Sequence, residues 1–230
     1  MVKKVDKVPE NLYFAVIGDI IRSKKIPNRS KTQEKLAETL ACVNEKYRDC
    51  LASKFMITLG DEFQGLLKTG GPAVELITGI EMKLYPVRLR FGVGVGEIVT
   101  AIDPELPLGA DGPAYHNARE MLTRLKSLEK KSKSPDRDCM VASGGLLNDE
   151  LVNTVFSLCA AIRKKWTRLQ WETVADCIEL GDNQLMLARK YKIGQPSVQK
   201  RLSGAEYYAY KNALSAVSRE FSRAVPDARA

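Results

Sequence analysis

Three glycines alternate with other residues in the segment "RFGVGVGEI" (90–98), at positions 92, 94 and 96. Successive side chains of a β-strand point to opposite faces, so this spacing leaves one face of a strand bare. Another backbone, a helix or a ligand can approach such a face closely. In a dinucleotide-binding fold the glycines stand in a strand-to-helix turn, and no helix follows here, which excludes that interpretation. We therefore predict one long strand over residues 87–100.

The segments before this strand alternate between the two kinds of secondary structure. Residues 12–21 are almost continuously apolar and predict a buried central strand. Residues 28–50 carry apolar residues at helical spacing, with Ser30 and Gln33 as a capping box. Residues 54–68 predict a hairpin that turns at Gly60-Asp61 with type II′ geometry.

The segments after the hairpin continue the alternation up to a pair of glycines. We predict helices over residues 70–84 and 112–128, a solvated loop over 129–137, a strand over 138–143 and a hinge at 144–145. Beyond the hinge only helices are predicted, over residues 149–166, 168–180, 183–193 and 195–221, before a frayed tail. We therefore place a domain boundary near residue 146, with domains over 1–145 and 146–230.

Composition bounds the class of protein and its partners. With 230 residues, of which 44% are hydrophobic, the chain suits one large or two small globular domains. A net charge of +8 favours polyanionic partners, among them nucleic acid, nucleotide phosphates and anionic membrane surfaces. The five cysteines are scattered without a CxxC pair, which argues against a disulfide framework or a zinc site. We find no signal-peptide core or membrane span, and expect a cytoplasmic protein without a membrane partner.

Two acidic residues stand where the predicted strands turn. Asp19 ends the first strand and Asp61 lies in the hairpin turn. If that strand neighbours the hairpin, both carboxylates meet at one end of the sheet, where their oxygens suit Mg²⁺ or Mn²⁺. Arg22, Lys24 and Lys25 follow Asp19 and suit phosphate groups. The alternative is that these residues are turn-formers and solvated surface charges.

Residues 183–208 follow the pattern of a helix-turn-helix motif. The first helix would pack through Leu185, Leu187 and Ala188, and the second would be anchored by Val198 and Leu202. We expect the second helix to meet base edges and phosphates through Gln195, Ser197, Gln199, Lys200 and Arg201. The alternative is a small helical bundle that contacts proteins.

Four stretches, "AVIGDII", "ITLGDEFQGLL", "RFGVGVGEI" and "GADGPAYHNAREM", resemble in sequence and order the signature stretches of class III nucleotidyl cyclases, and "GDEF" resembles the GGDEF diguanylate cyclases. The resemblance implies a ferredoxin-like palm, with Asp19 and Asp61 as ligands of Mg²⁺ or Mn²⁺. It also implies a nucleotide-type ligand, for which we expect contacts from Ile20, Arg22, Lys24, Gly60, Glu62 and Arg90.

The resemblance is weaker in the catalytic half. His116 and Glu120 occupy the positions of the transition-state Asn and Arg, although a shifted register would supply Asn117 and Arg119. Ile57 replaces the purine-selecting Lys and Gly109 its acidic partner. We therefore assign no catalytic residue, and whether the chain is an enzyme stays open.

The whole chain resembles the SatD family of bacterial proteins, through "GDIIRSK", "ITLGDEFQGLL" and "GADGPAYHNAR". Its second half resembles the region-four-like helix-turn-helix of sigma factors. Together these resemblances imply an α+β, ferredoxin-like domain followed by an all-α DNA-binding domain, assembled as a homodimer. We expect a transcriptional regulator in which nucleotide and Mg²⁺ control DNA binding. The alternatives are an enzyme that acts on a nucleoside triphosphate and a non-catalytic scaffold.

Overall fold

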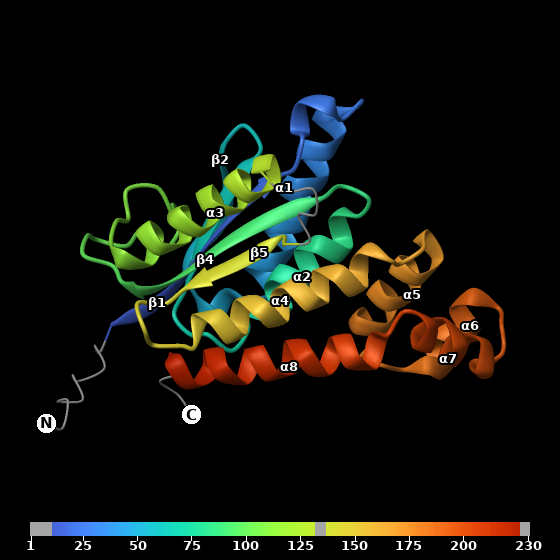
Figure 1. The fold of residues 1–230 in the computed structure, drawn as a ribbon. Coiled ribbons are helices and arrows are strands. Elements are labelled where there is room, and N and C mark those ends of the chain that lie inside the picture. The colour runs from blue at the N-terminus through green and yellow to red at the C-terminus, as the bar shows by residue number, and fades with distance from the viewer. Residues whose placement is uncertain (1–10, 132–136, 226–230) are drawn as a thin grey trace, which may run out of the picture.

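The computed structural model describes residues 11–131 and 137–225 (Figure 1). Residues 1–10, the centre of the predicted loop at 132–136 and the predicted tail at 226–230 lie outside these residues. The strands are β1 (Leu12–Ile20), β2 (Leu51–Leu59), β3 (Glu62–Leu67), β4 (Leu89–Glu97) and β5 (Cys139–Ala142). The first helices are α1 (Arg29–Lys46), α2 (Ala73–Leu84) and α3 (Pro113–Lys131), with short 3₁₀ turns η1 (Ser23–Lys25) and η2 (Arg48–Cys50). The later helices are α4 (Asp149–Lys164), α5 (Arg168–Glu179), α6 (Gln184–Tyr191), α7 (Gln195–Gly204) and α8 (Tyr207–Ala224).

The strands form one sheet in the order β2-β3-β1-β4-β5. The first four strands of that order are antiparallel to their neighbours, and β5 runs parallel to β4. The chain thus interleaves two β-α-β units, which is the ferredoxin-like arrangement. The prediction of an α+β, ferredoxin-like domain followed by helices is confirmed, and β1 lies at the centre of the sheet as expected.

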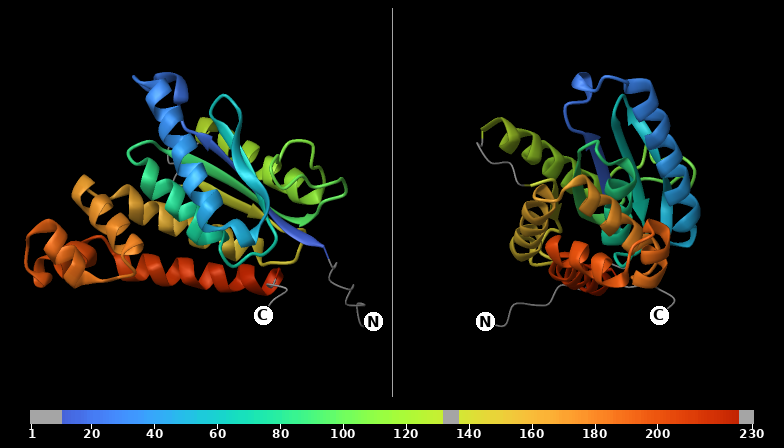
Figure 2. Two further views of the ribbon diagram at one scale, coloured as in Figure 1. Left: turned by 180° about the vertical axis from the view of Figure 1, so that it is seen from behind. Right: turned by 90° about the vertical axis from the view of Figure 1, so that its right-hand side faces the viewer.

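Helix α3 lies on one face of the sheet and α1 and α2 lie on the other, as the end-on view in Figure 2 shows. The glycines of β4 explain how closely α3 approaches. A Cβ added at Gly92 would lie 2.1 Å from the carbonyl oxygen of Ala118, and one at Gly94 would lie 2.0 Å from that of Ala114. The bare strand face predicted from the glycine spacing therefore receives a helix backbone.

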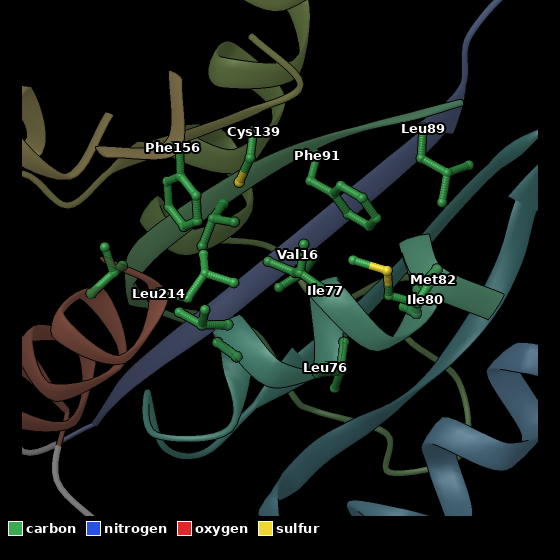
Figure 3. Packing of buried hydrophobic residues seen from close by; sticks show 14 of the residues in the cluster. Val16, Leu76, Ile77, Ile80, Met82, Leu89, Phe91, Cys139, Phe156 and Leu214 are labelled. Atoms are coloured by element: carbon green, nitrogen blue, oxygen red, sulfur yellow. The ribbon is translucent and has the colours of Figure 1, made fainter. Parts of the chain in front are cut away.

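The helices after β5 extend the core on the face that carries α1 and α2. Phe14 of β1 packs against Phe221 of α8 with ring centroids 4.9 Å apart. Phe156 of α4 and Leu214 of α8 lie in the same cluster of buried side chains as Phe91 of β4 (Figure 3). One hydrophobic core therefore includes residues from both sides of residue 146. The domain boundary near that residue stays a prediction.

The start of α1 and the extent of α7 differ from what the sequence predicted. The amino end of α1 is capped by Asn28, whose side chain accepts a hydrogen bond from the Lys31 amide, because Ser30 already lies inside the helix and bonds Glu34. The single helix predicted over 195–221 is two helices, because the chain turns at Glu206, whose φ of 53° is left-handed. Among the described residues, no helix is long and apolar enough to cross a membrane.

Candidate functional site

Three chain segments meet at the end of β1: the strand end itself, the hairpin tip and the start of β4. Asp19 of β1 lies opposite Glu62 of β3 on one side and Arg90 of β4 on the other. The Ile20 amide donates a hydrogen bond of 3.3 Å to the carbonyl oxygen of Asp61. The two acids singled out in the sequence are therefore neighbours in the fold, as the strand arrangement predicted.

The strand register directs several charged side chains toward α3. Ala15, Ile17 and Asp19 alternate along β1, and the first two pack against α3, so Asp19 lies on that face. Glu62 and Arg90 share the face through their pairing with Asp19. The α3 residues that meet them are Arg119, Lys126 and Glu129.

These side chains form a continuous network of ion pairs. Lys126 Nζ lies 3.4 Å from Asp19 Oδ2 and 3.6 Å from Glu62 Oε2. Arg90 Nε lies 3.3 Å from Asp19 Oδ2, and its Nη2 lies 3.0 Å from Glu129 Oε2. Arg119 pairs with Glu62, and Arg22 Nε lies 3.5 Å from Glu129 Oε1.

Asp19, which pairs with both Arg90 and Lys126, is only 7% accessible to solvent. Burial raises the pKa of its carboxyl group above the usual value, and this outweighs the opposite effects of Lys126 and Arg90. The nearby Asp61 raises the pKa further. The Arg90 Nε is buried and donates no hydrogen bond within the described part of the chain, despite its short distance to Asp19. Because burial disfavours the charged form of Asp19, a further cation beside this carboxylate would stabilise it.

Asp61 belongs to the hairpin tip, which α1 holds in place. Gly60 has a φ of 66°, as a glycine-first turn requires, and its carbonyl oxygen accepts a 2.8 Å hydrogen bond from Gln33 Nε2. Asp61 Oδ1 lies 3.9 Å from Arg29 Nη2. The tip carboxylate is therefore partly exposed and only loosely paired.

The side chains around Asp19 and Asp61 limit which kind of metal site can form here. Among residues 11–131 and 137–225, no group of three or more His, Cys, Asp or Glu side chains is arranged to hold a metal ion. Mg²⁺ is commonly held by one or two carboxylates together with phosphate oxygens and water. Asp19 and Asp61 therefore fit a cation that arrives with a phosphate-bearing ligand, and they do not fit a cage built from protein alone.

The residues expected to contact a nucleotide gather at this end of the sheet but differ in availability. Lys24 is exposed in η1, and Arg22 has a left-handed φ of 56°. Ile20 is buried, and its backbone amide already donates to the Asp61 carbonyl oxygen. Glu62 and Arg90 are already engaged in the ion pairs with α3.

The sequence reasoning missed Lys126 and Glu129. Arg119 and Lys126 are two turns apart on α3, with Glu129 one turn further, so all three share a helix face. Charged residues on a helix are usually solvated, so only the strand register shows where they point. His116 instead pairs with Asp111 at 2.8 Å, and Asn117 donates to the Val95 carbonyl oxygen.

A second candidate site lies on α5, α6 and α7, which pack together as a three-helix unit at one end of the molecule (Figures 1 and 2). Leu187, Val198 and Leu202 are fully buried between these helices, as the helix-turn-helix pattern predicted. Leu185 was expected in the core, but it is 58% exposed, because α6 buries its stripe through Leu187 instead.

The surface of α7 carries most of the residues expected to contact DNA. Gln195, Ser197, Gln199 and Lys200 are exposed. Gln199 is hydrogen-bonded to Gln184, Ser203 and Tyr208. Arg201 is only half-exposed, because its guanidinium group lies over the Tyr191 ring, 5.3 Å from the centroid.

Cations that the sequence reasoning did not name surround α7. Arg189 and Lys192 are exposed beside it, and Lys192 ends α6 in a left-handed conformation. Neither these two nor Lys200 forms an ion pair with another residue that the structure describes. Uncompensated cations of this kind would have been recognisable only once the packing of the three helices was known.

Comparison with known proteins gives one match to a family and several to solved structures. The chain aligns at 17% identity and a TM-score of 0.37 with the guanylate cyclase domain of RhGC from Catenaria anguillulae in complex with GTP, over 49% of this chain and 72% of that one. It aligns at 15% identity and a TM-score of 0.31 with the Regulator of Polyketide Synthase Expression from Bifidobacterium adolescentis, over 92% of this chain and 86% of that one. No curated protein matches. Since the SatD family model matches residues 13–217, the chain belongs to the SatD family.

Proposed function

We propose that this protein is a DNA-binding regulator in which α7 enters the major groove. The observation that carries the proposal is the outer surface of α7, where uncharged polar side chains lie among cations that form no ion pair with another described residue. Gln195 and Ser197 lie in its first turn, and Lys192 and Lys200 flank them. Amide and hydroxyl groups suit base edges, and cations suit phosphates. The buried Val198 and Leu202 anchor the opposite side of the helix.

The setting of α7 supports a connection to the rest of the molecule. Trp166, which follows α4, donates a hydrogen bond from Nε1 to the Ala205 carbonyl oxygen at the end of α7, at 2.6 Å. Helix α8 then runs back along the palm to Phe14. A change in the palm that shifts α4 or α8 would thus be transmitted directly to the position of α7.

We infer that the palm binds a phosphate-bearing, nucleotide-type ligand together with Mg²⁺ or Mn²⁺. Asp19 and Asp61 would hold the cation, and Lys24, an exposed cation in the turn that follows β1, would contact the phosphates. The raised pKa of Asp19 supports this, because a cation would relieve the cost of its buried charge. The bound cation would supply charge neutralisation for the phosphates.

Nucleotidyl transfer at the same site is the second candidate function. The observation that favours it is the position of Arg119 and Lys126, which reach from α3 to the carboxylates at the strand ends. Phosphoryl-transfer enzymes use cations in this way to stabilise developing charge. Incubation with Mn²⁺ and each nucleoside triphosphate, followed by mass spectrometry, tests for products. The regulator proposal requires no turnover.

DNA binding is tested with duplexes selected from a random library by the full chain. We expect binding whose affinity falls steeply with salt, and which a homodimer would direct to paired half-sites. Lys192→Ala with Lys200→Ala should flatten the salt dependence, whereas Gln195→Ala should relax the sequence preference. Lys165→Ala, at an exposed cation beyond the end of α4, is the control. Selection without enrichment, and affinity that does not depend on salt, would contradict the proposal.

A further inference from the structure

A cavity of about 400 Å³ lies between the end of α2, the start of β4 and the helices α4 and α5. It is distinct from the site at Asp19, since that carboxylate lies on the α3 face of the sheet and the cavity lies on the other. Its volume is within the range of small-ligand sites. Three aromatic residues, Tyr85, Trp166 and Trp171, line it. We refer to it as the α2–α5 cavity.

The base of the α2–α5 cavity holds a buried group of charges. Arg163 of α4 is 6% exposed, and its Nη2 lies 2.6 Å from Asp138 Oδ2 and 3.2 Å from Glu81 Oε1. Asp138 Oδ1 is buried and accepts no hydrogen bond from any residue that the structure describes. A buried carboxylate oxygen without a donor is costly, and its place in the cavity lining makes it a natural acceptor for a ligand.

The mouth of the α2–α5 cavity is positively charged. Arg88 and Lys164 are exposed cavity residues on opposite walls, one before β4 and the other at the end of α4. Arg88 forms no ion pair with any other described residue. With Arg137 and Arg163, four cations line the cavity against the two acids Glu81 and Asp138. The cavity therefore favours an anionic ligand.

The aromatic wall gives the second requirement for a ligand. Tyr85 and Trp171 stack with ring centroids 4.8 Å apart, and Trp166 meets Trp171 edge-on at 5.1 Å. Such a wall suits a planar ring, because a nucleobase binds favourably when it stacks on an aromatic side chain. A ligand that combines a planar ring, an N–H donor and an anionic group satisfies all three features.

We propose that the α2–α5 cavity binds a nucleoside monophosphate-type ligand as an effector. The base lies against Trp171, one of its N–H groups donates to Asp138 Oδ1, and the phosphate pairs with Arg88. Binding would reach DNA through Trp166, because this residue lines the cavity and also holds the end of α7. That last step rests on the proposed DNA binding, whereas ligand binding in the cavity does not.

Intrinsic fluorescence of the full chain tests the proposal, because Trp166 and Trp171 are the two tryptophans of the sequence. The probes are GMP and AMP, with guanosine and inorganic phosphate as partial ligands. We expect a saturable change with at least one nucleotide. Arg88→Ala should weaken binding by about tenfold or more, since a charge-assisted contact is lost. Trp171→Leu, with Trp166 as the remaining reporter, should weaken it similarly. Lys165→Ala, next to a cavity residue but outside the lining, should leave the affinity unchanged.

Each contrary outcome would overturn one identifiable part of the proposal. No saturable change with either nucleotide, or equal binding of inorganic phosphate, removes the effector proposal. Unchanged affinity in Arg88→Ala combined with its loss in Asp19→Asn would assign the nucleotide to the palm site instead. If the cavity binds GMP but GMP leaves DNA affinity unaltered, the link through Trp166 is wrong and the binding site stands. If the chain binds no DNA at all, the fluorescence result still decides the cavity on its own.

Discussion

Asp19 and Arg90 lie directly opposite each other on the central strands β1 and β4, with Arg90 Nε 3.3 Å from Asp19 Oδ2. The carboxylate proposed to hold a divalent cation is therefore already paired inside the protein, and Lys126 pairs with the same oxygen. A metal ion at this site must compete with two protein cations. The metal proposal can therefore be tested in two ways, by removing a metal ligand or by removing a competing protein cation.

Mn²⁺ binding should respond in opposite ways to two kinds of substitution. Asp19→Asn and Asp61→Asn should each weaken Mn²⁺ binding by about tenfold or more, because each removes a charged oxygen ligand. Lys126→Gln should strengthen it, because a competing cation is removed from Asp19. Isothermal titration calorimetry in the presence and absence of a nucleoside triphosphate measures both.

Asp111→Asn, at an exposed acid paired with His116, is the matched control for these titrations. Acidification should weaken Mn²⁺ binding, beginning at a higher pH than for an ordinary aspartate. The reason is that burial raises the pKa of Asp19, so protons compete with the metal earlier. Equal Mn²⁺ affinity in the wild type and in both Asp variants would rule out the site.

The close contact between β4 and α3 predicts a sharp difference between two glycines. Gly94→Ala should lower the free energy of unfolding by about 1–3 kcal/mol or more, because the new Cβ would lie 2.0 Å from the Ala114 carbonyl oxygen. Gly79→Ala in α2 meets nothing within 4 Å and should raise it by about 0.5–1 kcal/mol. Urea unfolding followed by circular dichroism compares the two, and equal effects would contradict the packing.

Features that depend on local spacing were accessible from the sequence. The alternating glycines of β4 predicted close backbone approach, and the turn at Gly60-Asp61 was predicted from two residues. The neighbouring positions of Asp19 and Asp61 were predicted on the condition that the first strand lies beside the hairpin, and the sheet order meets that condition. The family also followed, because its motifs are contiguous stretches of sequence.

Features that depend on tertiary contacts could not be predicted from the sequence. Arg163 belongs to a helix whose sequence gives no sign that this residue is buried, and its partners Glu81 and Asp138 are 82 and 25 positions away. The same holds for Lys126, whose contact with Asp19 depends on the crossing of α3 over the sheet. The break between α7 and α8 occurs at Glu206, a residue that seldom adopts the left-handed conformation found there.

The buried charges around Glu81 predict a pH-dependent stability. Burial, with Asp138 adding to it, raises the pKa of Glu81 from 4.5 to about 8, although Arg163 and Arg88 act in the opposite direction. The folded protein then keeps a proton that the unfolded chain has released, so the free energy of unfolding falls as the pH rises from about 4.5 to 8. Glu81→Gln should remove this loss, and its advantage over the wild type should grow across that range and then level off.

Urea titrations at several pH values measure this difference. The control is Glu75→Gln on the same helix, at an exposed acid paired with Lys46. Partial burial opposes ionisation of Glu75, but the hydrogen bonds from Lys46 and Tyr47 prevail and lower its pKa, so its variant should show the opposite sign. A constant difference between wild type and Glu81→Gln from pH 5 to 8 would show that the Glu81 carboxyl does not titrate in the folded state.

Lys200 and Arg201 should separate into a DNA contact and a packing residue, although they are neighbours in the chain. Lys200 is exposed and unpaired among the described residues, whereas Arg201 lies over the Tyr191 ring and its Nη1 is buried without a hydrogen-bond acceptor there. Lys200→Ala should lower DNA affinity, reduce the slope of log affinity against log salt by about 1, and leave the melting temperature unchanged. Arg201→Ala should lower the melting temperature, since it removes a cation–π contact of about 0.5–1 kcal/mol or more.

Arg201→Lys distinguishes charge from packing: if it restores the salt slope but not the melting temperature, Arg201 acts in both roles. Equal salt slopes and equal melting temperatures for the two alanine variants would show that the difference in burial between these residues has no functional consequence.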